Sequence, residues 1–262
     1  MADLAMYIDV TKCTGCRGCQ VACKQWNGLP AVSTSFSGSY ENPPRIGGDT
    51  WTKVRFFEQE KDGKVRFLFR KAQCMHCTKA SCVAVCAAGA ISQNDRGVVT
   101  IDQDRCVGCK NCVVACPFHS VGFSEDTGTS RKCRLCYDRI ENGMDPACVK
   151  ACPSGAVSIG DRGKILAQAN EKAGLLKQKG SRASIYGENE LGGLHVIYLL
   201  DDKPEAYGLP VNPQVATASL FGNWANALVG AGILIFAPFW LVFKERSKGV
   251  SESPGTGVDE NA

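Results

Sequence analysis

The stretch that decides the fold is CVGCKNCVVACP, residues 106–117, in which the spacing is Cys-x2-Cys-x2-Cys-x3-Cys-Pro. Three thiolates this close together wrap one corner of a cubane 4Fe–4S cluster, whereas the fourth lies past a turn and faces a second cluster. The stretch therefore predicts a pair of clusters that exchange a ligand. Its cysteines are Cys106, Cys109, Cys112 and Cys116.

Three further groups of four accompany this one, so that all 16 cysteines lie between Cys13 and Cys152. The first group repeats the same spacing, and the second and fourth have a longer spacer between their middle cysteines. Every group ends in Cys-x3-Cys. The three groups are Cys13, Cys16, Cys19 and Cys23; Cys74, Cys77, Cys82 and Cys86; and Cys133, Cys136, Cys148 and Cys152.

The cysteine groups belong to an internal repeat. Residues 8–23 and 101–116 are identical at nine of sixteen positions, and residues 80–92 and 146–158 at six of thirteen. Repetition on this scale predicts two ferredoxin-like units, one built from the second and third groups and the other from the first and fourth.

Disulfides and structural zinc are the competing explanations for so many cysteines. Disulfides need an oxidising compartment, and residues 1–11 lack the basic start and apolar run of a secretory signal peptide. A zinc site needs only two Cys-x2-Cys pairs, whereas a whole four-cysteine unit recurs here. We therefore expect four 4Fe–4S clusters. The net charge of +4, with basic and acidic residues interspersed, gives no support to nucleic-acid binding.

The rest of the chain completes an α+β fold. Residues 51–59 and 64–71 predict a β-hairpin about Asp62-Gly63, and residues 165–179 predict an amphipathic surface helix. The expected fold is two ferredoxin-like double-cluster units with a β-hairpin insertion and one C-terminal transmembrane helix. The expected divisions are 1–28 with 131–166 (first unit), 29–71 (insertion), 72–130 (second unit), 167–215 (linking region), 216–244 (transmembrane helix) and 245–262 (short tail).

The transmembrane prediction follows from a long uncharged segment. No charged residue occurs from 206 to 243, and the apolar part from 218 to 243 comprises 26 residues with Trp224 and Trp240 near its ends. A bilayer core needs about 20 helical residues, so the segment is long enough to span it once.

Flanking charge predicts the orientation of the span. Lys244, Arg246 and Lys248 follow it, whereas Lys203 is the one lysine in the fifteen or so residues before it. The positive-inside rule then places the tail in the cytoplasm and the cluster domain on the other, periplasmic side of the cell membrane. We expect the folded cluster domain to cross as cargo of a partner with a twin-arginine signal.

Four such groups in this order resemble those of the wire subunits in the molybdenum and tungsten oxidoreductase family. There the first and fourth groups share two clusters, and the second and third share the other two. The resemblance implies four ligand sets. Set one is Cys13, Cys16, Cys19 and Cys152; set two is Cys23, Cys133, Cys136 and Cys148; set three is Cys74, Cys77, Cys82 and Cys116; set four is Cys86, Cys106, Cys109 and Cys112. Ala87 stands where the ferredoxin pattern usually has proline, which affects the local turn only.

Several stretches outside the ligands are similar to the beta subunit of formate dehydrogenase. They are CKQWN (23–27), GSYENPP (38–44), TWTKVRF (50–56), LGGLHVIY (191–198) and GLP (208–210). The resemblance implies a non-catalytic electron-transfer subunit of anaerobic respiration. It would join a catalytic alpha subunit with a molybdenum or tungsten pterin cofactor to a haem b gamma subunit that reduces quinone. A wire in another membrane oxidoreductase, such as a hydrogenase or a polysulfide, thiosulfate or nitrite reductase, is the alternative. A zinc scaffold or a redox sensor is a third possibility, which four full ligand sets disfavour.

No catalytic constellation is evident, because none of the three histidines lies in a nucleophile or hydrolytic motif. His76 and His119 adjoin cysteine groups and either hydrogen-bond a cluster sulfur or have no special role. The charges of Lys110, Arg131, Lys132 and Arg134 either tune a cluster potential or are solvated.

Overall fold

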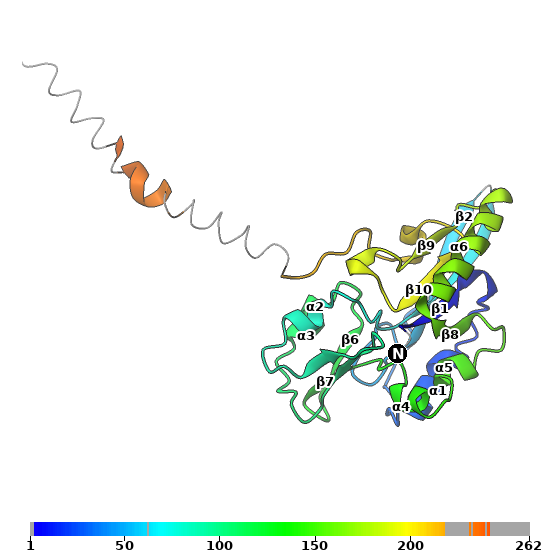
Figure 1. Ribbon diagram of the computed structural model, residues 1–262, viewed down its shortest axis with the longest axis horizontal. Helices are drawn as coiled ribbons and strands as arrows, with labels where there is room; N and C mark the ends of the chain where they lie inside the picture. Colours follow the sequence, from blue (N-terminus) through cyan, green and yellow to red (C-terminus); the bar gives the residue numbers. More distant parts are fainter. Residues whose placement is uncertain (1–2, 62, 218–230, 232, 239, 242–262) are drawn as a thin grey trace, which may run out of the picture. The chain divides into compact units, whose positions relative to one another are not determined.

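The computed structural model describes residues 3–61, 63–217, 231, 233–238 and 240–241, in two units, Met1–Thr217 and Ala218–Ala262. Figure 1 shows the elements of the first unit. The strands are β1 (Leu4–Asp9), β2 (Lys53–Lys61), β3 (Lys64–Ala72), β4 (Ile91–Gln93), β5 (Val99–Ile101), β6 (Val121–Ser124), β7 (Thr129–Lys132), β8 (Val157–Asp161), β9 (Ser184–Tyr186) and β10 (Val196–Leu200). The α-helices are α1 (Gly18–Trp26), α2 (Ser81–Ala84), α3 (Asn111–Ala115), α4 (Tyr137–Glu141), α5 (Ala147–Lys150) and α6 (Arg162–Gln178). Three short 3-10 helices are η1 (Val10–Lys12), η2 (Glu190–Gly192) and η3 (Pro204–Tyr207).

A four-stranded sheet in the order β8-β1-β10-β9 forms the centre of this unit. β1 pairs antiparallel with β8 and parallel with β10, with Met6 opposite Ile159 and Val196. The two strands β9 and β10 come from residues 167–215, which the sequence suggested only as a linking region with the end of a helix. The sheet therefore draws on both ends of the cluster-bearing sequence.

Residues along each strand point alternately to the two faces of the sheet, and both faces are buried. Tyr7 and Ile197 pack on one face against Ile165, Ala169 and Ala173 of α6. Figure 1 shows α6 beside the strands of this sheet. The opposite face contributes to the main core with residues such as Met6, Ile8, Val196, Tyr198 and Leu200. The sheet thus separates a cysteine-free core under α6 from the core that contains cysteines.

The predicted surface helix is confirmed as α6, but it begins three residues earlier than expected. Asp161 caps it, since its Oδ1 accepts a hydrogen bond of 3.0 Å from the backbone amide of Lys164. An Asp at this position satisfies an amide that the helix leaves unpaired.

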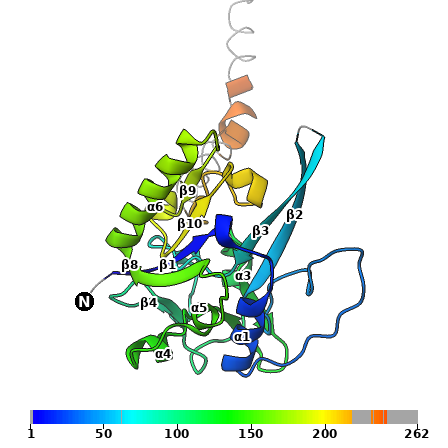
Figure 2. The same cartoon turned by 90° about the vertical axis from the view of Figure 1, so that its right-hand side faces the viewer.

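The predicted β-hairpin is also confirmed. β2 and β3 pair in register from Lys53 opposite Ala72 to Lys61 opposite Lys64, and Figure 2 shows them as one long ribbon. Gly63 in the turn has a φ of +70°, which glycine adopts without strain.

The sequence repeat is also a repeat of backbone conformation. Gly15 and Gly108 both have a φ of +69°, and the residues before α1 and α3, Arg17 and Lys110, have φ values of 61° and 62°. Each cysteine-rich loop therefore turns in the same way before its helix begins. The second ferredoxin-like region consists of α2, α3 and the small antiparallel pairs β4-β5 and β6-β7.

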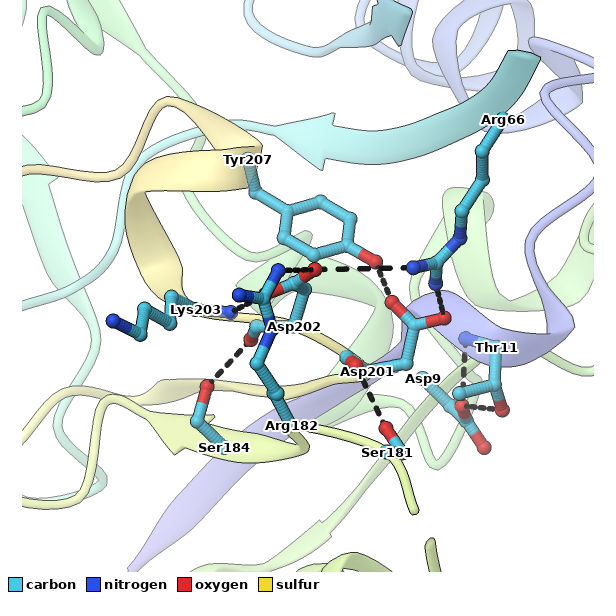
Figure 3. Close-up of polar contacts among 10 residues, drawn as sticks. All are labelled: Asp9, Thr11, Arg66, Ser181, Arg182, Ser184, Asp201, Asp202, Lys203 and Tyr207. Atoms are coloured by element: carbon cyan, nitrogen blue, oxygen red, sulfur yellow. Dashed lines mark hydrogen bonds and ion pairs between the residues drawn. The ribbon is translucent and has the colours of Figure 1, made fainter. Parts of the chain in front are cut away.

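A polar cluster after β10 ties three segments together (Figure 3). Asp201 pairs with Arg66 of β3 and accepts a hydrogen bond from the hydroxyl of Tyr207 in η3. Asp202 accepts one of 2.7 Å from Arg182, which precedes β9. These carboxylates hold the hairpin and the end of the unit to the central sheet.

Among the residues that the structure describes, no helix combines the length and the hydrophobicity needed to cross a bilayer. The predicted span at 216–244 lies mostly outside the described residues, and the tail at 245–262 lies wholly outside them.

Candidate iron-sulfur centre

Each cysteine group places its last two cysteines on one short helix or just beyond its end. Cys19 and Cys23 lie in α1, one turn apart, and both are buried. Because the two residues differ by four positions, one helical turn separates their side chains along the helix axis. The other three pairs are Cys82 and Cys86 at α2, Cys112 and Cys116 at α3, and Cys148 and Cys152 at α5.

The four cysteines of set two line one cavity. Cys23 reaches it from α1, whereas Cys133, Cys136 and Cys148 come from the fourth group, more than a hundred residues away. Met6, Leu135, Pro146 and Trp51 are among the other lining residues. The structure therefore brings together the cysteines of the first and fourth groups that the resemblance assigned to one cluster.

The four cysteines of set four line a second cavity. Cys86 comes from the second group, and Cys106, Cys109 and Cys112 come from the third. Ala90, Ile91 and Val107 contribute apolar side chains to the same wall. The exchange of one cysteine between groups thus occurs in this region as well.

Cysteines assigned to sets one and three lie near enough to affect one another's pKa. Burial raises the pKa of Cys13, and the neighbouring thiols of Cys152 and Cys16 raise it further. Cys19 is influenced in turn by Cys13 and Cys16. In set three, burial raises the pKa of Cys77, as do the thiols that lie beside it, those of Cys74, Cys116 and Cys82.

Cysteines of different sets lie near enough to influence one another or share a buried core. Burial raises the pKa of Cys19 to about 12, with a further contribution from Cys148 of set two. Burial raises the pKa of Cys133 of set two, and the thiol of Cys23 raises it further. Cys74 of set three also raises it, so Cys133 and Cys74 lie near one another. Set three adjoins set four, where Cys82 and Cys112 share one buried cluster with Ile91, Val99 and Val121. The sets therefore form a row from one to four.

The two ends of this row reach the surface. Cys16 of set one and Cys109 of set four are exposed, whereas the other fourteen cysteines are buried or half-buried. A row of redox centres with accessible ends is suited to accept an electron at one end and release it at the other.

The donor chemistry of the sets suits iron-sulfur clusters. Thiolates are the ligands of 4Fe–4S clusters, and burial raises the pKa of most of these thiols, as for Cys136 at about 11 and Cys82 at about 12. A bound cationic metal favours the deprotonated form of such a thiol. When bound, the clusters would supply one-electron redox chemistry, and these residues would hold them.

Zinc binding requires a tighter arrangement of ligands. A structural zinc ion has four ligands at about 2.0–2.3 Å, whereas the four cysteines of a cubane bind four different iron atoms. In the part of the chain that the structure describes, no three His, Cys, Asp or Glu side chains lie close enough to hold a single metal ion.

The histidines differ in their surroundings. His76 is fully buried, and its Nδ1 accepts a hydrogen bond of 3.0 Å from the backbone amide of Val99. Its Nε2 therefore carries the proton in the neutral ring and has no hydrogen-bond partner among the described residues. His119 is exposed, and His195 bonds the carbonyl of His76 and the carboxylate of Asp3.

Of the basic residues singled out in the sequence, Lys132 alone is buried, at 4% exposed. Arg134 and Lys110 lie at the surface and pair with Asp138 and Glu125. Arg131 is half-buried, 4.0 Å from Asp49. Sequence reasoning missed Lys71, which is 1% exposed; its position three residues before the second cysteine group is the one feature that could have indicated it.

Comparison with known proteins agrees with this geometry. Residues 65–162 match the 4Fe–4S dicluster domain family. The nitrate-inducible formate dehydrogenase iron-sulfur subunit of Escherichia coli is 39% identical over 239 residues, which cover 89% of this chain and 81% of that protein. The formate dehydrogenase iron-sulfur subunit of Haemophilus influenzae is 40% identical, covering 81% and 70%. The formate dehydrogenase beta subunit of Megalodesulfovibrio gigas is 35% identical, covering 77% and 95%. With two groups of four cysteines gathered at single cavities and this similarity over most of its length, the chain belongs to the family of formate dehydrogenase iron-sulfur subunits.

Proposed function

We propose that the chain carries four 4Fe–4S clusters, one in each ligand set, and conducts electrons one at a time between a formate-oxidising catalytic subunit and a membrane subunit with haem b. The observation that carries this proposal is the row of four sets. Each set adjoins the next through buried cysteines, and only Cys16 and Cys109, at the two ends, are exposed. The row divides a long transfer into short steps.

The position of the chain's exit from the first unit supports a direction for the electrons. The backbone amide of Ala216 donates a hydrogen bond of 3.1 Å to the hydroxyl of Ser81, the first residue of α2. The next residue, Cys82, belongs to set three and packs with Cys112 of set four. We infer that set four passes electrons to the membrane subunit and that set one receives them from the catalytic subunit.

A membrane anchor at residues 216–244 completes the proposal. The described residues 233–238 are helical, and large apolar side chains among them are exposed, as for Leu234 at 78% and Phe236 at 71%. Exposed apolar side chains on a helix are favourable in lipid rather than in water. With Lys244 and Arg246 just beyond, the tail would lie in the cytoplasm and the cluster domain in the periplasm, exported with a partner that carries a twin-arginine signal.

Protease treatment of oriented vesicles tests this placement. The cluster domain should be cleaved in spheroplasts and protected in inside-out vesicles. Cleavage in inside-out vesicles only would refute the orientation, and recovery of the whole chain in the soluble fraction would refute the anchor.

Electron paramagnetic resonance on the complex solubilised from native membranes tests the redox role. Spectra would be recorded as isolated, after formate and after dithionite. Signals of reduced 4Fe–4S clusters after formate support the whole proposal. Signals with dithionite but not with formate would retain the wire and assign it to another oxidoreductase. A silent sample rich in zinc would refute electron transfer.

A further inference from the structure

Three lysines of the first unit are buried, and they differ in what surrounds their ammonium groups. Lys53, 2% exposed, pairs with Glu41 at 2.5 Å. Lys132, 4% exposed, donates hydrogen bonds to two backbone carbonyls. Lys71, 1% exposed, has only the Sδ atom of Met6 as a hydrogen-bond contact among the described residues, at 4.0 Å.

A buried ammonium without an anion is unstable, because removing an ion from water is costly unless an opposite charge compensates it. In the described part of the chain, no carboxylate pairs with Lys71. The other two buried lysines do not have this unpaired charge, because Lys53 and Lys132 each have oxygen partners. Lys71 therefore requires a compensating anion other than a carboxylate of the described residues.

Cysteine sulfurs of two different sets, which are thiolates when they bind iron, lie near Lys71. Cys19 belongs to set one, and Cys148 and Cys133 belong to set two. Met6, the contact of the ammonium, lines the cavity of set two and packs in one buried core with Cys19 and Cys148. The ammonium of Lys71 therefore lies beside cysteines of both sets.

We propose that the Lys71 ammonium is a fixed positive charge shared by the clusters of sets one and two, and that it raises the reduction potentials of both. Reduction adds one electron to a cluster, so a cation nearby stabilises the reduced form more than the oxidised form. This inference rests on the proposed function. It makes Lys71 a tuning residue at the receiving end of the wire, where easier reduction favours uptake of electrons.

Selective removal of the charge tests the role of Lys71. In Lys71→Met a neutral chain of similar length replaces the cation beside Met6. At a fixed solution potential, we expect the ratio of reduced to oxidised cluster to fall about tenfold in sets one and two, a shift of about 59 mV for one electron. The clusters of sets three and four should shift much less. Lys71→Arg keeps the charge and should keep the native potentials.

The measurement is a redox titration of the intact complex followed by electron paramagnetic resonance. The signals are assigned with Cys148→Ala and Cys152→Ala, which remove ligands of sets two and one. Lys53→Met is the matched control, because it also neutralises a buried lysine but one that Glu41 already compensates. It should lower the melting temperature while leaving the potentials of sets one and two unchanged.

The outcomes separate this inference from the function on which it rests. A native complex without signals of reduced clusters would overturn the proposed function. Native signals with unshifted potentials in Lys71→Met, or equal shifts in all four sets, would overturn the role of Lys71 alone. If Lys71→Met does not assemble, Lys71→Gln provides a second neutral variant. A shift in Lys71→Arg equal to that of either neutral variant would also overturn the inference.

Discussion

Exchange of ligands between cysteine groups leads to a prediction that the linear sequence would not suggest. Cys148 and Cys152 lie one helical turn apart, yet they belong to different sets. Cys19 and Cys152 are 133 positions apart, yet they belong to one set. Alanine at either Cys19 or Cys152 should therefore disrupt one and the same 4Fe–4S cluster, whereas alanine at Cys148 should disrupt its neighbour.

The expected magnitudes follow from one cluster per set. Cys19→Ala and Cys152→Ala should each lose about a quarter of the iron in 4Fe–4S form, and the double variant should lose no more than that quarter. The double variant Cys148→Ala/Cys152→Ala should lose about half, because it removes a ligand from two clusters. In such a double-mutant cycle, the losses of cluster iron add when the two residues belong to different sites and do not add when they belong to one site.

Mössbauer spectroscopy of the ⁵⁷Fe-labelled complex measures this quantity directly, since it separates 4Fe–4S iron from other forms. Cys16→Ala is a further test of set one, because it should lose the same quarter of the cluster iron although Cys16 is exposed. The reasoning would be refuted if Cys19→Ala/Cys152→Ala lost about half of the cluster iron, or if Cys148→Ala/Cys152→Ala lost only a quarter.

Four further predictions concern stability, cluster content and hydrogen exchange. Asp161→Ala removes the cap of α6 and should destabilise the chain by about 1 kcal/mol in chemical denaturation, whereas Asp161→Asn should not. Burial would raise the pKa of Asp202, but hydrogen bonds and charges, chiefly from arginine, lower it. The stability that this carboxylate contributes should thus be present above its unfolded pKa and be lost as pH falls through its folded value. Thermal melts of Asp202→Asn should lack this acid-dependent component. Gly108→Ala would place a Cβ 2.3 Å from the carbonyl oxygen of Gly128 at a φ of +69°, so it should reduce cluster content, whereas Gly28→Ala, with no atom within 4 Å, should not. After iron removal by a chelator, hydrogen exchange should accelerate around α2 and α3 before it does in α6 and β10, because α6 and the face of β10 that packs on it share a core without cysteine.

The cysteine spacing predicted the local structure well. The Cys-x2-Cys-x2-Cys-x3-Cys spacing requires a tight loop followed by a helix, and the structure has this in both copies, with Gly15 and Gly108 at the same φ. The hairpin and α6 were predictable because alternation and helical periodicity are local patterns. The mixed α/β content of the first unit was predictable for the same reason.

The central sheet was not predictable, because its pairing is not local. β1 and β10 lie side by side although about 190 residues separate them, and β10 reads simply as the apolar run VIYLL. A buried run of this length does not indicate its partner strand or its direction. Lys71 was missed for a related reason, since a lysine in a strand is usually solvated, and only the fold shows that the end of β3 is buried on both faces.

The x3 spacing that ends every cysteine group also explains how the fold produces a wire. Two residues four positions apart lie about 6 Å apart along a helix, since each residue rises by about 1.5 Å. In α1 the first of these, Cys19, belongs to set one and the second, Cys23, to set two. Because one short helix supplies cysteines to both sets, helix geometry would fix the separation of the two clusters proposed for them. The same holds where α2 supplies Cys82 to set three and places Cys86 in set four. Sets two and three have no common helix. Burial raises the pKa of Cys133, and the nearby thiols of Cys23 and Cys74 raise it further; Cys74 lies two residues beyond the buried end of β3.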